Sequence, residues 1–222
     1  MIFFNFFIGT ILGSHALVIV QRNFDKSFVY SFSKCDACNF PLTLFDQIPI
    51  FSFILKRGRC SYCKEKIPFM TLFIELFSGI IFSHIFLFSL DGFNDGLFLF
   101  FFLICSIFDY YFLEFETILL IFPAVLGLCA PNSAIHSFSF LGWFLLVTLT
   151  LLMLLMNLSG KLGTGDTLFF VLISLYKGQL FGLHVLFLAS LLFLFLYPFN
   201  TKKSAIAFLP FLLISYCFFA FL

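Results

Sequence analysis

The segment LFLFFFLICSIFDYYFL, residues 97–113, contains Asp109 as its sole charged side chain. An apolar stretch approaching about 20 residues is long enough to cross the hydrocarbon core of a bilayer as a helix. The same character extends over the whole chain: of its 222 residues, 62% are hydrophobic and only 10% are charged. Soluble domains carry about 25% charged residues. A soluble enzyme, a nucleic-acid-binding protein and a disordered linker are therefore excluded for the chain as a whole.

Apolar stretches of this kind recur between short polar segments along the chain. The sequence therefore predicts an all-α, polytopic integral membrane protein with about eight transmembrane helices. The expected spans are 3–20, 69–90, 97–113, 117–130, 138–158, 166–176, 180–197 and 205–221. The fourth and sixth spans are short, so we expect them to be tilted, merged with a neighbour or partly re-entrant.

The basic residues indicate how the chain is oriented in the membrane. Of the 12 Lys and Arg, eight fall between Arg22 and Lys66, and the others are Lys161, Lys177, Lys202 and Lys203. If the loop 21–67 is cytoplasmic, the outer loops are 91–96, 131–137 and 177–179, and only Lys177 lies outside. Because basic residues concentrate in cytoplasmic loops, the sequence predicts an external N-terminus and a cytoplasmic polar loop.

The longest polar segment contains two close pairs of cysteines. Cys35 and Cys38 form the first C-x-x-C pair, and Cys60 and Cys63 form the second. Two such pairs can supply the four thiolates of a closed, tetrahedral zinc site, which folds a loop and leaves no position open for catalysis. Gly58 suits the tight turn before the second pair. Reduced, metal-free thiols are the alternative.

Two acidic residues are predicted to lie at the cytoplasmic ends of spans. Asp109 lies near the inner end of the third span, and Asp166 begins the sixth in the motif Gly163-Thr-Gly165-Asp166. Ionisable groups at membrane depth are costly and usually functional. Two neighbouring carboxyl groups that share a proton can activate water and polarise a carbonyl, as in aspartic proteases. The two glycines would let the backbone approach this pair or a substrate closely.

Simpler explanations exist for each acid. Asp166 could cap the helix that it begins, and Asp109 could face polar headgroups from a helix end. Glu75, near the inner start of the second span, could line the same cavity as the two aspartates. It could equally pair with Lys64 or Lys66. The matching depth of Asp109 and Asp166 favours the catalytic interpretation.

At these residues the chain resembles bacterial prepilin peptidases, the type IV leader peptidases of the GxGD aspartic protease family. It is most similar to the shorter versions that process competence pseudopilins. The resemblance runs nearly end to end. It rests on Gly13-Ser14 with Arg22, the four-cysteine loop with Asp46-x-Ile-Pro49, Ser52 and Arg57-Gly-Arg-Cys60, Glu75, Asp109, Gly163-x-Gly165-Asp166, and Ala207-Phe-Leu-Pro210-Phe.

The chain departs from the family pattern beside both aspartates. The family follows its first catalytic aspartate, after six residues, with Pro-Asp or a near relative, and here Glu116-Thr117 stands in that place. A lysine often follows the GxGD aspartate by two residues, where this chain has Leu168. Neither change removes a carboxyl group of the pair.

The resemblance implies an intramembrane aspartic endopeptidase in the bacterial cell membrane. Its catalytic residues would be Asp109 and Asp166, supported by Gly163, Gly165 and Glu75. Its substrate would be a prepilin or pseudopilin precursor with a short basic leader and a hydrophobic N-terminal helix, cut at the cytoplasmic face of the lipid bilayer. Methylation of the new N-terminus with S-adenosylmethionine is a further implication. Nucleic acid is not an expected partner.

The expected domains are the first transmembrane helix at 1–20, the zinc-binding loop at 21–67 and the membrane-embedded peptidase domain at 68–222. Three alternatives remain open. One is a general GxGD protease of the presenilin or signal-peptide-peptidase kind, which has no need of the four-cysteine loop. The second is a non-enzymatic membrane assembly factor built on that loop. The third is a transporter, which should have acids near the midplane and internal repeats, and neither is found in the sequence.

Overall fold

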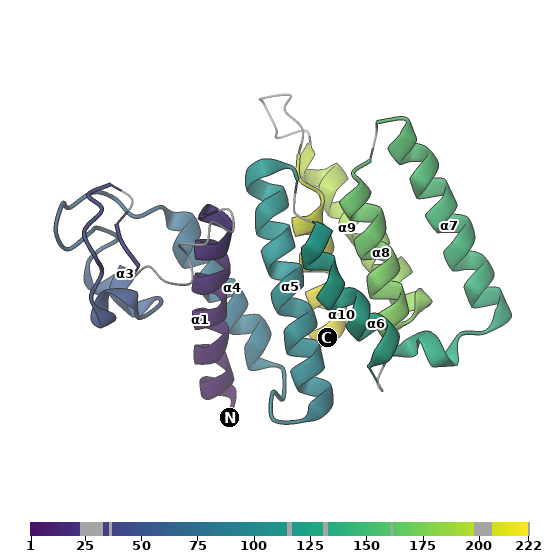
Figure 1. The fold of residues 1–222 in the computed structure, drawn as a ribbon, viewed down its shortest axis with the longest axis horizontal. Helices are drawn as coiled ribbons and strands as arrows, with labels where there is room; N and C mark the ends of the chain where they lie inside the picture. The colour runs from purple at the N-terminus through teal and green to yellow at the C-terminus, as the bar shows by residue number, and fades with distance from the viewer. Residues whose placement is uncertain are drawn as a thin grey trace. The chain divides into compact units, whose positions relative to one another are not determined.

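The structure, a computed structural model, describes residues 1–22, 33–35, 37–114, 117–130, 133–160, 162–197 and 206–221. The chain divides into two compact units, Met1–Gly92 and Phe93–Leu222, and each is described by itself (Figure 1). The described residues form helices and no extended β-strand; two isolated bridges pair Lys34 with Pro41 and Arg59 with Lys66. The predicted all-α fold is confirmed for this part of the chain.

The first unit is built on two closely packed antiparallel helices, α1 (Ile2–Gln21) and α4 (Phe69–Ser83). A Cβ added at Gly13 would lie 1.9 Å from the Ser78 Oγ and 3.0 Å from the Ile74 carbonyl oxygen. Glycine is therefore required there for the two helices to approach this closely. The polar loop between them contains η1 (Leu44–Gln47) and α3 (Phe51–Leu55).

The second unit contains most of α5 (Leu90–Phe112) and the helices that follow it. These are η2 (Thr117–Leu120), α6 (Ile121–Cys129), η3 (Ala134–Ser137), α7 (Phe140–Leu158), α8 (Thr164–Lys177), α9 (Gln179–Leu196) and α10 (Leu209–Phe221). Aromatic rings of α5, α8 and α10 fill its centre. The rings of Phe98, Phe102, Phe169, Tyr176 and Tyr216 are all buried there. Three helices thus share one close-packed aromatic core.

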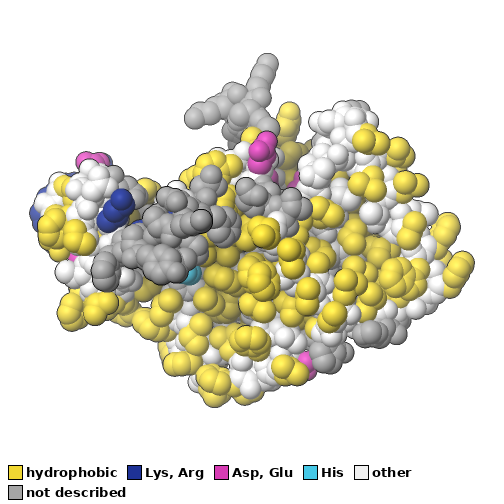
Figure 2. All heavy atoms as spheres, in the orientation of Figure 1, with side chains coloured by type: hydrophobic (Ala, Val, Ile, Leu, Met, Phe, Trp, Pro, Cys, Tyr) yellow, Lys and Arg dark blue, Asp and Glu magenta, His cyan; other side chains and the backbone are white. Residues whose placement is uncertain are grey.

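Within the described ranges, four helices are long and apolar enough to cross a membrane: α1, α5, α7 and α9. Three shorter apolar helices cover Phe69–Ser83, Ile118–Cys129 and Leu209–Phe221. Hydrophobic side chains cover much of the visible face, and the visible Lys and Arg side chains lie over the polar loop (Figure 2). These features are those of a membrane protein. The count of eight spans and the three domain boundaries stay predictions.

The basic residues that indicate the orientation are only partly covered by the structure. Lys161, Lys202 and Lys203, which the sequence predicts to lie on the inner face, are outside the described residues. Lys177, the one basic residue predicted to lie outside, ends α8. The orientation in the membrane therefore stays a prediction from the sequence.

Two differences of equal size from the expected helix boundaries lie around the turn before the third span. The second span is expected to end at 90, but α4 ends at Ser83, seven residues earlier. The sequence predicts an outer loop at 91–96, but α5 begins at Leu90 and includes this segment. Ser89 supports the early start, because its Oγ accepts a hydrogen bond from the Gly92 N–H at 3.0 Å. Asp91 in the first turn places a favourable charge at the helix N-terminus. Capping by polar residues thus extends the helix beyond its apolar stretch.

Candidate functional site

Asp109 lies near the C-terminal end of α5 and is turned into the protein. It is 9% exposed, and its Oδ2 accepts a hydrogen bond from the Leu209 backbone N–H at 3.0 Å. The Phe208 N–H is a second backbone donor. These donors lie at the start of α10, where the first N–H groups of a helix have no partner within it. The alternative that Asp109 faces lipid headgroups does not fit this position.

Asp166 lies in the first turn of α8 and is 7% exposed. Its Oδ2 accepts a hydrogen bond from the Gly163 N–H at 3.3 Å. The N-cap of this helix is Gly163, so Asp166 is not the N-cap itself but assists the cap from the third helical position. A Cβ at Gly163 would lie 3.0 Å from the Asp166 Oδ2, so glycine allows the close approach expected of this motif.

The two aspartates line one cavity of about 350 Å³, although 56 residues lie between them in the sequence. Both carboxyl groups are buried, and both face this one space. The cavity is lined by Asp109, Leu113, Glu114, Leu120, Gly163, Thr164, Gly165, Asp166, Leu168 and Leu209. It therefore combines acidic groups, small residues and leucines in one space.

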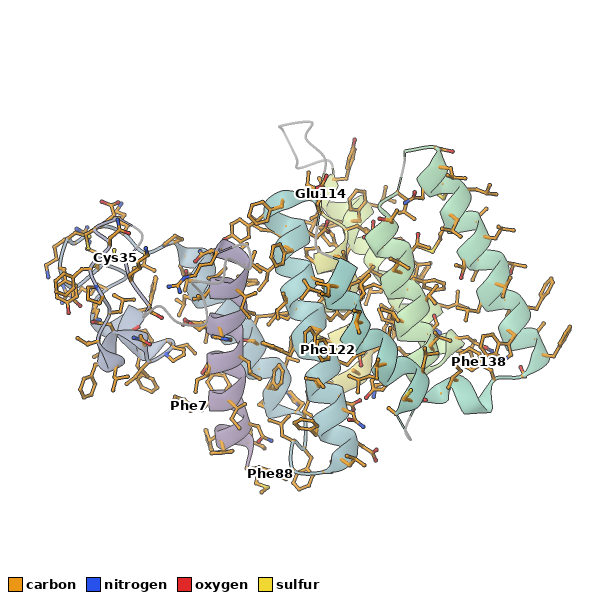
Figure 3. All side chains as sticks on the ribbon, viewed as in Figure 1. Phe7, Cys35, Phe88, Glu114, Phe122 and Phe138 are labelled. Carbon is orange, nitrogen blue, oxygen red and sulfur yellow. The ribbon has the colours of Figure 1, made fainter. Side chains whose placement is uncertain are left out.

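One acid in this cavity has no role in the sequence motifs. Glu114 lies just beyond the end of α5 and is exposed (Figure 3 labels it). It lines the cavity together with the two aspartates. In the sequence it resembles any solvated acid of a short loop, and only its closeness to Asp109 along the chain hints at this position. Leu168, which stands where the family often has a lysine, also lines the cavity. Of the other departure from the family pattern, Glu116 lies outside the described residues, as does the side chain of Thr117.

Glu75 belongs to the first unit, where α4 carries it. It is 5% exposed, and its Oε2 accepts a hydrogen bond from the Ile50 N–H at 2.7 Å. The Ser14 side chain of α1 is a further hydrogen-bond partner. Lys64, one expected ion-pair partner, instead donates to the Ser61 carbonyl oxygen at 2.9 Å. Glu75 thus joins α1, α4 and the polar loop within its own unit, and its place beside the aspartates stays a prediction.

The four cysteines of the polar loop come together. The sulfur atoms of Cys35, Cys38, Cys60 and Cys63 all lie within 4.8 Å of one another (Figure 3 labels Cys35). Those of Cys35 and Cys63 are 3.9 Å apart. Four thiols at this separation match the donor set of a tetrahedral thiolate site. The cluster can therefore hold one metal ion.

The backbone around each cysteine pair closes in the same way. In the first pair, the Cys35 N–H donates to the Phe40 carbonyl oxygen at 3.0 Å. In the second pair, the Cys60 N–H donates to the Glu65 carbonyl oxygen at 2.9 Å. Each hydrogen bond spans five residues and encloses one C-x-x-C segment. The sequence predicts the sulfur donors but not this repeated turn.

Left-handed backbone conformations occur in and beside these turns, at Asn39, Arg57, Gly58 and Lys64. The residue after each second cysteine has a positive φ, 55° at Asn39 and 63° at Lys64. Asn is among the side chains that tolerate this region best. Gly58, before the second pair, has a φ of 65°, so the expected tight turn is present.

Backbone donors also favour metal binding by one of these thiols. The N–H groups of Cys63 and Tyr62 point toward the Cys60 sulfur and lower the pKa of this thiol to about 6. Because the thiolate is the form that ligates metals, this environment favours coordination. Cys60 is also the most buried of the four cysteines. The second pair is therefore organised around Cys60.

The first part of the chain matches a known family. Residues 7–89 match the family described as Bacterial Peptidase A24 N-terminal domain. That range includes all four cysteines and Glu75. Three curated relatives named prepilin leader peptidase/N-methyltransferase are similar to the chain, from Neisseria gonorrhoeae, Vibrio cholerae and Bacillus subtilis. The resemblance to bacterial prepilin peptidases is thereby confirmed, while the competence type stays a prediction.

The matches to these prepilin peptidases are partial. The relative from Bacillus subtilis is 31% identical over 53% of this chain and 49% of its own length, and that from Vibrio cholerae is 29% identical over 51% and 47%. The relative from Neisseria gonorrhoeae is 35% identical over 27% of the chain and 22% of its own length. The chain thus spans less than half the length of each relative. No solved structure matches it.

Proposed function

We propose that the chain is a prepilin leader endopeptidase whose catalytic groups are Asp109 and Asp166. The observation that carries this proposal is the shared cavity, in which two buried carboxyl groups from α5 and α8 lie beside the Gly163-x-Gly165 loop. Neither acid has an ion-pair partner among the described residues that line the cavity, and two carboxyl groups buried together are costly, which favours a functional role beyond helix capping. The similarity to prepilin leader peptidases supports the same reaction.

The chemistry follows from two carboxyl groups that share one proton. The ionised group takes a proton from a water molecule, which then attacks the scissile carbonyl carbon. The protonated group donates a hydrogen bond to the carbonyl oxygen, where negative charge develops, and later a proton to the leaving amine. The backbone N–H groups of Leu209 and Gly163 each hold one carboxyl oxygen and thus fix the two acids in place.

The proposed substrate is a prepilin or pseudopilin precursor whose basic leader ends at the cytoplasmic face. The hydrophobic helix that follows the leader would remain in the bilayer, beside the apolar helices of the chain. Four leucines, Leu113, Leu120, Leu168 and Leu209, give the cavity an apolar wall against which such a segment can pack. The distribution of basic residues supports an external N-terminus and a catalytic site at the cytoplasmic face.

Leader removal tests this proposal directly. The full chain is co-expressed with a pseudopilin precursor, and the precursor and product are separated by mass, with the cut site mapped at its new N-terminus. Wild type is expected to remove the leader, whereas Asp109→Asn and Asp166→Asn each insert normally and leave the precursor uncut. Asp91→Asn is the matched control, because Asp91 is an exposed acid at the other end of the helix that carries Asp109. Cleavage by either Asn variant of the pair at a near-normal rate would refute the paired-acid mechanism.

We also propose that the four-cysteine cluster holds a structural zinc ion. Cys35, Cys38, Cys60 and Cys63 would supply all four ligands, so the ion would have no open position for water or substrate. Its contribution would be to fold the polar loop. A non-enzymatic assembly factor would tolerate changes at the two aspartates and fail on changes at the cysteines, so the cleavage assay separates that alternative from the endopeptidase.

Methyl transfer is a second proposed activity, and it is supported by the names of the relatives. S-adenosylmethionine would supply the methyl group that the new N-terminal amine accepts. Incubation of purified chain and precursor with labelled S-adenosylmethionine is expected to label the cleaved product at its N-terminus. A cleaved product that stays unlabelled would restrict the proposal to the peptidase.

A further inference from the structure

A second polar cluster lies at the opposite ends of the two helices that carry the aspartates. Asp95 lies in the second turn of α5, and Tyr176 and Lys177 end α8. The Asp95 Oδ1 accepts hydrogen bonds from the Tyr176 hydroxyl at 2.5 Å and from the Lys177 Nζ at 2.7 Å. The Lys177 ammonium also lies 4.8 Å from the centroid of the Tyr176 ring. We call these three residues the α5–α8 clasp.

Aromatic rings connect the clasp to the region of the aspartates. Phe98 of α5 stacks on Tyr176 of α8 with ring centroids 4.7 Å apart, and Phe102 stacks on Phe169 at 4.5 Å. None of these four residues has any exposed surface. A continuous buried seam thus runs between α5 and α8 from the clasp toward the cavity.

Helical spacing aligns both ends of this seam. Asp95 and Asp109 are 14 residues apart on α5, which is nearly four turns and corresponds to roughly 21 Å along the axis. Asp166 and Lys177 are 11 residues apart on α8, which is about three turns and roughly 16 Å. Each helix therefore presents its clasp residue and its aspartate on nearly the same face. Because α8 runs antiparallel to α5 (Figure 1), the clasp lies at one end of this seam and the two aspartates lie at the other.

We propose that the α5–α8 clasp sets the axial register of these helices and thereby positions Asp109 opposite Asp166. Stacked rings and apolar contacts are not directional, and they tolerate sliding along the seam better than charged hydrogen bonds do. Proton transfer through a shared water requires the two carboxyl groups to be placed to within about 1 Å. Asp95, Tyr176 and Lys177 are positioning residues in this scheme, which rests on the proposed function.

The charge pattern of the sequence supports this role for Lys177. In the predicted orientation Lys177 is the only basic residue outside, where it contributes nothing to the inner positive charge. Its ion pair with Asp95 gives it a function within the fold. Both side chains lie at the edge of an apolar helix bundle, with 29% of the Asp95 side chain and 25% of the Lys177 side chain exposed. Loss of either charge would therefore leave the other charge poorly compensated.

Steady-state cleavage by the purified full chain tests the clasp. Asp95→Ala and Lys177→Met are expected to lower kcat on the order of 10- to 100-fold with little change in KM, because the precursor binds at the other end of the helices. The exchanged pair Asp95→Lys with Lys177→Asp is expected to recover much of that loss, and Asp91→Asn to leave kcat unchanged. Unaltered kcat in the single variants, or a change in KM alone, would overturn the inference.

An activity-independent measurement separates the clasp from the proposed function. Amide hydrogen exchange in wild type and Asp95→Ala is compared over Gly163–Phe169, at the far end of α8. Faster exchange there is expected, because a loosened register reaches the first turn of α8. An increase confined to the residues around Asp95 and Lys177 would overturn the inference even if wild type fails to cleave any precursor. If Asp95→Ala does not insert, Asp95→Asn and Tyr176→Phe keep the side-chain shapes and take its place in both assays.

Discussion

At the scale of single residues, the carboxyl group of Asp109 is held by a chain segment far from it in sequence, whereas that of Asp166 is held by Gly163 of its own motif. Leu209, one hundred positions after Asp109, supplies an N–H that holds its carboxyl group. The residue pattern identifies the two acids because few charges occur in the apolar spans. It does not identify the donor, because a backbone N–H has no sequence signature and its position depends on how α10 packs.

The cysteines provide a prediction at the same scale. Purified chain is expected to contain about one zinc per molecule, and Cys35→Ser or Cys60→Ser to lose most of it, because three thiolates leave the tetrahedral site incomplete. Elemental analysis of the detergent-purified protein measures this. Cys129→Ser is the control, because Cys129 is an exposed cysteine outside the cluster. A metal-free wild type whose four thiols are freely alkylated would contradict the zinc proposal.

At the scale of helices, apolar stretches predict where helices exist better than where they begin. Each of the eight expected spans contains a helix in the described structure, but α5 begins at Leu90, seven residues before the expected start at 97. The cause is local capping by Ser89 and Asp91, which hydropathy alone does not register. Tight packing between helices is visible in sequence only as isolated small residues, such as Gly13 of α1.

Gly13 leads to a prediction about the α1–α4 pair. Gly13→Ala is expected to lower the stability of the first unit by about 1–3 kcal/mol, because the new methyl group would collide with Ser78 and crowd the Ile74 carbonyl. Thermal unfolding in detergent, followed by circular dichroism, measures the change. Gly127→Ala in α6 is the matched control: its nearest neighbour would be 3.7 Å away, so helix propensity is expected to leave the protein as stable or slightly more stable. Equal effects of the two substitutions would contradict close packing at Gly13.

At the scale of the whole molecule, the described structure confirms an all-α membrane protein and divides it into two units. Composition is sufficient to predict the fold class, because a chain this apolar needs lipid around it. The number of spans and the orientation depend on how the chain lies in the bilayer. Side-chain contacts within the protein do not specify this. The predicted orientation therefore rests on the distribution of Lys and Arg between the inner and outer loops.

Labelling of single added cysteines in whole cells tests the orientation. In a chain whose Cys105, Cys129 and Cys217 are replaced by serine, Asp91→Cys is expected to react with a membrane-impermeant maleimide in intact cells. Ser159→Cys is expected to react only after the membrane is permeabilised, because it precedes the Gly163-x-Gly165 loop on the predicted inner face. Both positions are exposed, so burial does not explain a difference between them.

The same chain without an added cysteine is the control for this labelling, because it measures any reaction of the four loop cysteines. Subtracting its signal leaves the reaction of the added cysteine alone. Labelling of Ser159→Cys in intact cells, with Asp91→Cys protected until permeabilisation, would place the aspartates on the outside.

If Asp109 and Asp166 act as one catalytic unit, neither carboxyl group functions without the other. A double-mutant cycle in the leader-cleavage assay tests this most directly, with Asp109→Asn, Asp166→Asn and the double variant compared at equal amounts of folded enzyme. We predict that each single change lowers the cleavage rate about as far as the double change does. Losses that multiply in the double variant, or a single variant that retains near-normal activity, would contradict the paired action of the two aspartates.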